Sequence, residues 1–222
     1  MFRDAALVAA KDLRLEARSR VAFNQIAPLA LVILLLFAFA LDPARGVLAR
    51  AAPGLFWVAV LLCALFAVQR AFAIESGDGR SDALRLSGLD PAGIFLGKVA
   101  AIALELAALE VLLGLGVAVL YDASFGGWVL LVATGASATA AIAAAGTLYG
   151  VLAAGLRVRE TLLPLLLLPV LAPVLIGSTR AFEAAFSGVP ADGWPWLGLL
   201  TLFALVYLVA GALAFGSLLE DM

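Results

Sequence analysis

Two glutamates, Glu105 and Glu110, are the only ionisable side chains that interrupt the long apolar blocks of this chain deeply. An ionised carboxylate in hydrocarbon costs at least about 2.5 kcal/mol, so each must face protein or water, or carry a proton. Lys98 precedes Glu105 by seven residues, about 10 Å along a helix and too far for contact. Two interpretations stay open: a polar path or subunit contact, and neutral hydrogen-bonded carboxyl groups inside a bundle.

The chain lacks the residues that several kinds of chemistry require. The chain has no histidine, and its two methionines stand at the termini, so the usual axial haem ligands are missing from the interior of the chain. The single cysteine, Cys63, fits a small buried apolar residue, and no Cys/His cluster could hold zinc. The motif GIFLGK at 93–98 has the wrong spacing for a phosphate-binding loop. We therefore expect that the chain is not an enzyme, that it binds no metal or cofactor, and that it has no nucleic-acid partner.

The elements that must position these groups are membrane helices. The chain is 65% hydrophobic and only 14% charged, with a mean hydropathy of +1.13, which excludes an ordinary soluble domain. A helix needs about 20 apolar residues to cross the bilayer core. The sequence predicts an all-α polytopic membrane protein in which residues 1–222 form one transmembrane domain with six spans, at about 24–41, 51–73, 95–120, 128–155, 161–180 and 195–219.

The distribution of basic residues predicts the orientation. Eleven lysines and arginines lie in the N-terminal segment and in the second and fourth loops, and only Arg45, Arg50 and Arg180 lie on the other side. The positive-inside rule then predicts cytoplasmic termini, and an even number of spans requires both termini on one side. We expect a multi-pass protein of a bacterial inner membrane.

The first 22 residues predict an amphipathic helix in the membrane interface. Lys11, Arg14 and Arg18 recur at helical spacing, opposite an apolar stripe that begins at Phe2. Such a helix is held by apolar burial and by anionic lipid. The alternative is that the basic residues contact a cytoplasmic partner.

The longest polar stretch, residues 70–94, has features beyond those of a solvated linker. Gly77-Asp78-Gly79 predicts a tight turn, and residues 80–89 could form a short helix that carries Leu84. A plain linker is the alternative interpretation.

Two spans have unusual compositions. The fourth is rich in small residues and includes the pair Gly146 and Gly150, which predicts close helix packing. The fifth carries Pro164, Pro169 and Pro173, which predict a bent helix. Beyond it, a short re-entrant or interfacial helix is expected at 180–187 among aromatic residues.

Three stretches carry a resemblance to a known family: ARAAPGLFWVAVLL (49–62), FAIESGDGRSDAL (72–84) followed by LGKVAA, and LRVRETLLPLLLLPVLAPVLIGSTRA (156–181). Over nearly its whole length the chain resembles the haem exporter protein B (CcmB) family, ABC-type permease subunits of the cytochrome c maturation system. Ile74 and Ser81 depart from the pattern expected of that family.

The resemblance implies an ABC-2-type permease whose cytoplasmic loop contacts a separate ATPase. The loop residues that it assigns to ATPase docking are Phe72, Glu75, Asp78, Gly79, Asp82 and Leu84. It also implies partners: a CcmA-like ATPase that binds ATP-Mg, a CcmC-like membrane subunit that handles haem, a small CcmD-like subunit and a CcmE-like haem chaperone. Haem would be the cargo of the complex.

Two other functions stay open at this stage. The chain could be the permease of another ABC-2 exporter, for a drug or a polysaccharide, or a membrane scaffold without transport. Within the resemblance, ATP hydrolysis could drive haem export or release of the haem-loaded chaperone by a conformational change.

Overall fold

The computed structural model describes residues 1–41, 46–73, 88–121, 127–154 and 159–220, and these residues contain no β-strand. The long apolar blocks form long helices because a backbone in hydrocarbon must satisfy its own hydrogen bonds. The elements, in chain order, are α1 (Phe2–Ser19), the π-helix η1 (Ala22–Ile26), α2 (Ala27–Ala40), α3 (Val47–Ala73), α5 (Pro91–Tyr121), α6 (Trp128–Ala154), α7 (Arg159–Phe186), the 3₁₀ turn η3 (Pro190–Gly193) and α8 (Trp194–Glu220).

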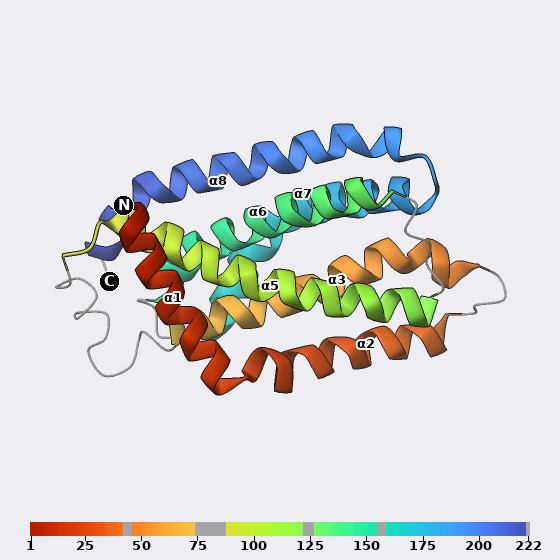
Figure 1. Cartoon of the computed structure of the whole chain (residues 1–222), viewed down its shortest axis with the longest axis horizontal. Coiled ribbons are helices and arrows are strands. Elements are labelled where there is room, and N and C mark those ends of the chain that lie inside the picture. Colours follow the sequence, from red (N-terminus) through yellow and green to blue (C-terminus); the bar gives the residue numbers. More distant parts are fainter. Residues whose placement is uncertain (42–45, 74–87, 122–126, 155–158, 221–222) are drawn as a thin grey trace.

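Six helical segments in the described residues are long and apolar enough to span a membrane. They run side by side along the long axis, with the N- and C-terminal ends of the chain at the same end of the bundle (Figure 1). The predicted fold class, an all-α polytopic membrane protein, is confirmed. Helix α1 differs from the others because it runs across the bundle at that end, as an interfacial helix would (Figure 1).

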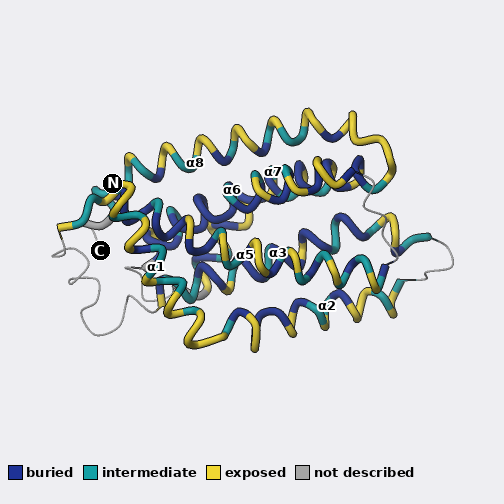
Figure 2. The backbone as a smooth tube through the Cα atoms, viewed as in Figure 1, coloured by how far each residue is buried: buried dark blue, intermediate teal, exposed yellow. Residues whose placement is uncertain are grey.

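Helix α6 is the centre of the bundle. In its most apolar window 61% of the residues are buried, against 17% in the span that contains α8. Figure 2 shows the same contrast, with much of α8 exposed along the edge of the bundle. The small side chains predicted for close packing explain this position, because they let neighbouring helices approach α6.

The expectation of a separate interfacial helix at 180–187 was wrong. Helix α7 continues through these residues to Phe186 because their aromatic side chains pack inward. The ring of Phe182 lies 5.1 Å from Phe56 and 5.0 Å from Trp57 of α3, centroid to centroid. The helix stops where Gly188 takes a φ of 76°, a left-handed conformation that glycine adopts without strain.

Helix α7 is also continuous through Pro164, Pro169 and Pro173. Neighbouring helices of a membrane bundle can satisfy the carbonyl groups that a proline leaves free. The bending role of these residues stays a prediction.

Gly146 and Gly150 face α3. A Cβ added to Gly146 would lie 2.6 Å from Cγ2 of Val68, and one added to Gly150 would meet the ring of Phe72. Both glycines therefore allow α3 and α6 to approach closely toward the end of the bundle that α1 crosses.

This packing predicts that Gly146→Ala and Gly150→Ala destabilise the protein. The added methyl groups must displace Val68 or Phe72, and overpacking typically costs about 1–3 kcal/mol. The apparent melting temperature of the detergent-solubilised chain, followed by tryptophan fluorescence, should fall for both variants. Gly198→Ala is the matched control, because a Cβ there meets nothing within 4 Å. Equal melting temperatures for all three variants would contradict the assignment.

Candidate functional site

Helix α1 presents an acidic face to the bundle. Asp4, Asp12 and Glu16 recur at spacings of four and eight residues, with the buried Val8 between them, so all four lie along one side. Gly97 of α5 makes room for this side, since a Cβ there would lie 2.6 Å from the carbonyl oxygen of Ala5. We call the contact of α1 with α3 and α5 the α1 junction, formed by Asp4, Asp12, Glu16, Arg70 and Lys98.

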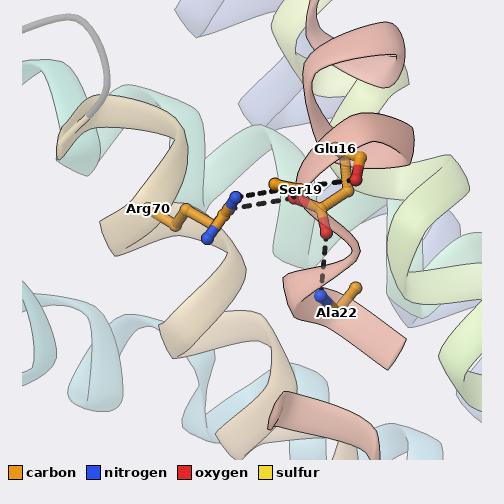
Figure 3. Close-up of polar contacts among 4 residues, drawn as sticks. All are labelled: Glu16, Ser19, Ala22 and Arg70. Atoms are coloured by element: carbon orange, nitrogen blue, oxygen red, sulfur yellow. Dashed lines mark hydrogen bonds and ion pairs between the residues drawn. The ribbon is translucent and has the colours of Figure 1, made fainter. Parts of the chain in front are cut away.

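Glu16 and Arg70 connect α1 with α3 (Figure 3). The Nε–H of Arg70 donates to Oε2 of Glu16 at 2.9 Å, and Nη2 donates to Oγ of Ser19 at 2.6 Å. The other oxygen of Glu16 accepts the backbone N–H of Ala22 at 2.8 Å, where α1 turns into η1. One carboxylate thus holds α3 and fixes the turn between α1 and the first span. The fork of the guanidinium suits this paired contact.

Lys98 connects α1 with α5. Its side chain is 1% exposed, and its Nζ lies 3.6 Å from a carboxylate oxygen of Asp12. The same Nζ lies 5.1 Å from the ring centroid of Phe72, at the end of α3. An ammonium group that is almost fully buried needs a compensating charge, and breaking such a pair is strongly destabilising. Asp12 and Phe72 therefore hold Lys98 between three helices.

The start of α1 is tied to the start of α5. The Met1 ammonium lies 3.1 Å from the carboxylate of Asp4 and 3.5 Å from that of Asp90. The hydrogen bond from this ammonium lowers the pKa of Asp4, and the same bond raises the pKa of the amine. The contact therefore stabilises the fold at neutral pH. It is lost in acid as Asp4 takes up a proton, and in base as the amine loses one.

Glu105 extends the α1 junction toward the membrane interior. It lines a small pocket of about 30 Å³ together with Asp12, Glu16 and Arg70. Its Oε1 is buried and has no hydrogen-bond partner in the part of the chain that the structure describes. A pocket of this size has room for about one water molecule. Glu105 thus lies beside the charged contacts of α1, although Lys98 faces Asp12 and not Glu105.

A larger cavity of about 580 Å³ opens beside the junction. The turn into α2 forms one wall through Gln25 and Ile26, and the ends of α3 and α6 form others through Arg70 and Gly150. Because the turn is held by Glu16, a displacement of α1 would change the shape of this cavity.

Most residues predicted for ATPase docking, Glu75, Asp78, Gly79, Asp82 and Leu84, lie outside the described residues. Phe72 is described, and its place differs from that of a docking contact. The side chain is 4% exposed, packed against Gly150 and Lys98. In this arrangement its ring faces the bundle because it fills the space that the missing Cβ of Gly150 leaves.

The α1 junction holds both ends of the segment that was predicted to dock the ATPase. Arg70 lies three residues before the end of α3 at Ala73, and Asp90 immediately precedes α5. Both are bound by α1, through Glu16 and through the Asp4–Met1 pair. Helix α1 therefore holds the two helix ends between which this segment lies.

The other predicted residues lie elsewhere. Lys11, Arg14 and Arg18 are exposed on α1, and the ammonium group of Lys11 lies 3.1 Å from the carboxylate of Asp12. Glu110 lies on α5 beyond the junction, where its Oε1 accepts a hydrogen bond from the hydroxyl of Thr139 on α6.

The sequence interpretation missed the acidic face of α1 and its contacts with Arg70 and Lys98. The signal was present, because Asp4, Asp12 and Glu16 share a helical stripe distinct from the basic and apolar ones. Arg70 entered that interpretation only as a charge of the second loop, and Lys98 also as a residue too far from Glu105 for contact. Their burial depends on how α1 crosses the bundle, which hydropathy does not show.

Comparisons with known proteins agree with one another. The family model described as "CcmB protein" matches residues 3–221. The chain is 31% identical to "Heme exporter protein B" of Paracoccus denitrificans over 205 residues, which cover 88% of this chain and 90% of the relative. It is 34% identical to the proteins of that name from Escherichia coli K12, with 79% and 82% covered, and from Haemophilus influenzae, with 73% and 74% covered. The chain belongs to the CcmB family.

The junction predicts that Arg70→Met loosens α1. A hydrogen bond to a charged group contributes about 1.5–3 kcal/mol. Loss of this contact should therefore speed the local opening of α1 away from α3 by about tenfold or more. Hydrogen–deuterium exchange of residues 16–22 in nanodiscs should rise accordingly. Arg14→Met, on the exposed side of the same helix, is the control and should leave that exchange unchanged. Unchanged exchange in both variants would show that Arg70 does not hold α1.

Proposed function

We propose that this member of the CcmB family is the membrane subunit of an ABC-type complex for haem export in c-type cytochrome biogenesis. Two features support this function. The family model covers almost the whole chain, and the relatives that cover most of it carry the name "Heme exporter protein B". The described residues contain six helices that are long and apolar enough to span a membrane, as a permease subunit requires.

The proposed location is the bacterial inner membrane, with both termini in the cytoplasm. The excess of lysine and arginine in the N-terminal segment and the even-numbered loops supports this orientation. In this orientation α1 lies at the inner surface, where Lys11, Arg14 and Arg18 can meet anionic lipid headgroups. The α1 junction then lies at the cytoplasmic end of the bundle.

The energy source in this proposal is a separate ATPase of the CcmA kind, which binds ATP-Mg. It docks on the segment after α3 through Glu75, Asp78, Gly79, Asp82 and Leu84, and Phe72 anchors the end of that helix. A CcmC-like subunit, a CcmD-like subunit and a CcmE-like chaperone complete the complex. Haem is its cargo, and the chain itself holds no cofactor.

The mechanism that we propose is mechanical. The observation that carries it is the attachment of α1 to both ends of the docking segment, through Glu16–Arg70 and through Asp4 and Met1 at Asp90. A movement imposed by the ATPase would displace α1, α3 and the start of α5 together. The same movement would reach α2 through the turn that Glu16 fixes at Ala22. A conformational change of this kind can release the haem-loaded chaperone without haem passing through this subunit.

Docking is tested by reversing the charges of the segment. The triple variant Glu75→Lys, Asp78→Lys and Asp82→Lys should lose the ATPase on co-purification, because like charges across an interface suppress association. Insertion into the membrane should be unaffected. Asp192→Lys, an exposed acidic residue at the other end of the bundle, serves as the control. If ATPase association and turnover survive the triple reversal, the docking assignment is wrong.

Transmission is tested by exchanging the charges of the junction. Glu16→Arg and Arg70→Glu should each lower the yield of matured c-type cytochrome by about tenfold, since each leaves two like charges in contact. The ATPase should still co-purify. The double variant restores the ion pair, although an arginine at position 16 cannot accept the N–H of Ala22, so it should recover part of the yield. Wild-type yields from both single variants would contradict the proposed route of transmission.

A further inference from the structure

A long groove runs along the outside of the bundle between α5 and α6. It has a volume of about 810 Å³, and its walls combine larger apolar side chains, such as Leu104 and Leu131, with small residues: Ala103, Ala107 and Gly114 of α5, and Gly135, Ala136 and Ala140 of α6. Along α5 it extends from Ala100 to Val117, about 25 Å at 1.5 Å per residue. This length approaches the thickness of the hydrocarbon core, so the groove passes through both leaflets.

Glu110 lies in the floor of this groove, near the middle of its length. Its Oε1 accepts the hydrogen bond from Thr139, while its Oε2 has no hydrogen bond from the residues that the structure describes. That oxygen lies beside Gly135, where a Cβ would be 3.4 Å from Oε2. A carboxyl group that faces lipid is costly, whereas a donor from a neighbouring helix would satisfy it.

The dimensions favour a helix as the occupant. A single lipid belongs to one leaflet, and the groove crosses both. Small residues on both walls let a helix backbone approach closely, which is how membrane helices associate. The aromatic residues Trp128, Phe182 and Phe186 close one end of the groove and would limit the depth at which a helix sits.

A second copy of this chain does not match Glu110. All its lysines and arginines lie outside the spans or toward their ends, so none can reach a carboxyl group in the middle of the bilayer. The exposed hydroxyl of Thr201 on α8 is already bonded to Ser137 and to the carbonyl oxygen of Leu197. Tyr207, near the middle of α8, is half-buried and stacked on Phe203, so a helix of a different protein is the better source of the donor.

We propose that the α5–α6 groove binds a transmembrane helix of a different membrane subunit, and that this helix presents a hydrogen-bond donor or cation to Glu110 at mid-bilayer depth. The inference rests on the proposed function only for the presence of a second membrane subunit in the complex. The inference adds the place on this chain where that subunit binds and the chemical group that recognises the subunit.

The first test fills the groove. Ala107→Trp places an indole in the groove, whereas Ala108→Trp is the matched control, because Ala108 is exposed on the same helix but does not line the groove. From solubilised membranes, the Ala107→Trp chain should retain about a tenth of the second membrane subunit that the Ala108→Trp chain retains. Equal retention would overturn the proposal. Retention of the ATPase in both variants separates this outcome from a failure of the proposed function.

The second test addresses Glu110 directly. Glu110→Gln keeps an acceptor and should retain the subunit, whereas Glu110→Leu removes the acceptor and should lose it by about tenfold. A photoreactive residue at position 107 of the assembled complex should crosslink to a membrane helix of that subunit, at a residue within one turn of a donor side chain. The same residue at position 209, on the exposed side of α8, should not. Crosslinks from position 107 only to lipid or to a second copy, or equal retention by the two Glu110 variants, would overturn the proposal.

Discussion

The hydrocarbon core of the membrane excludes charge, and this constraint organises the whole molecule. Helices satisfy their own backbone, so the spans need only apolar side chains. Charged side chains gather at the ends of the spans and on α1. The interhelical ion pairs Glu16–Arg70 and Asp12–Lys98 both include α1, which crosses the bundle where the hydrocarbon ends. The same constraint thus places the interhelical ion pairs of the described residues at the end of the bundle that α1 crosses, while hydrogen bonds between neutral and carboxyl groups remain within the spans.

The same constraint explains which features the sequence could predict. The apolar blocks were sufficient for the six spans, because insertion depends on hydropathy averaged over many residues; the interfacial place of the N-terminal helix stays a prediction. The ends of α7 and the place of Phe72 were not predictable in this way. Each depends on a few contacts, such as Phe182 with Trp57 and Phe72 with Gly150, which only the packed bundle brings together.

The two intramembrane glutamates, Glu105 and Glu110, are residues of the same type that lie in different surroundings. Both were placed on one span and given the same two interpretations. Glu105 lies in a small polar pocket beside Glu16 and Arg70, inside the chain. Glu110 lies five residues further along α5 in an apolar groove on the outside of the bundle, with Thr139 as its partner. The first therefore belongs to the junction, whereas the second points to a neighbouring subunit.

The central claim is that α1 and α5 move as one body when the ATPase binds nucleotide. Spin labels at positions 14 and 108, in a Cys63→Ala background within the assembled complex, report the distance between α1 and α5 by double electron–electron resonance. Labels at positions 14 and 213 report the distance between α1 and α8. The account predicts that ATP binding leaves the first distance unchanged and shifts the second. A change in the first distance with a constant second distance would contradict it.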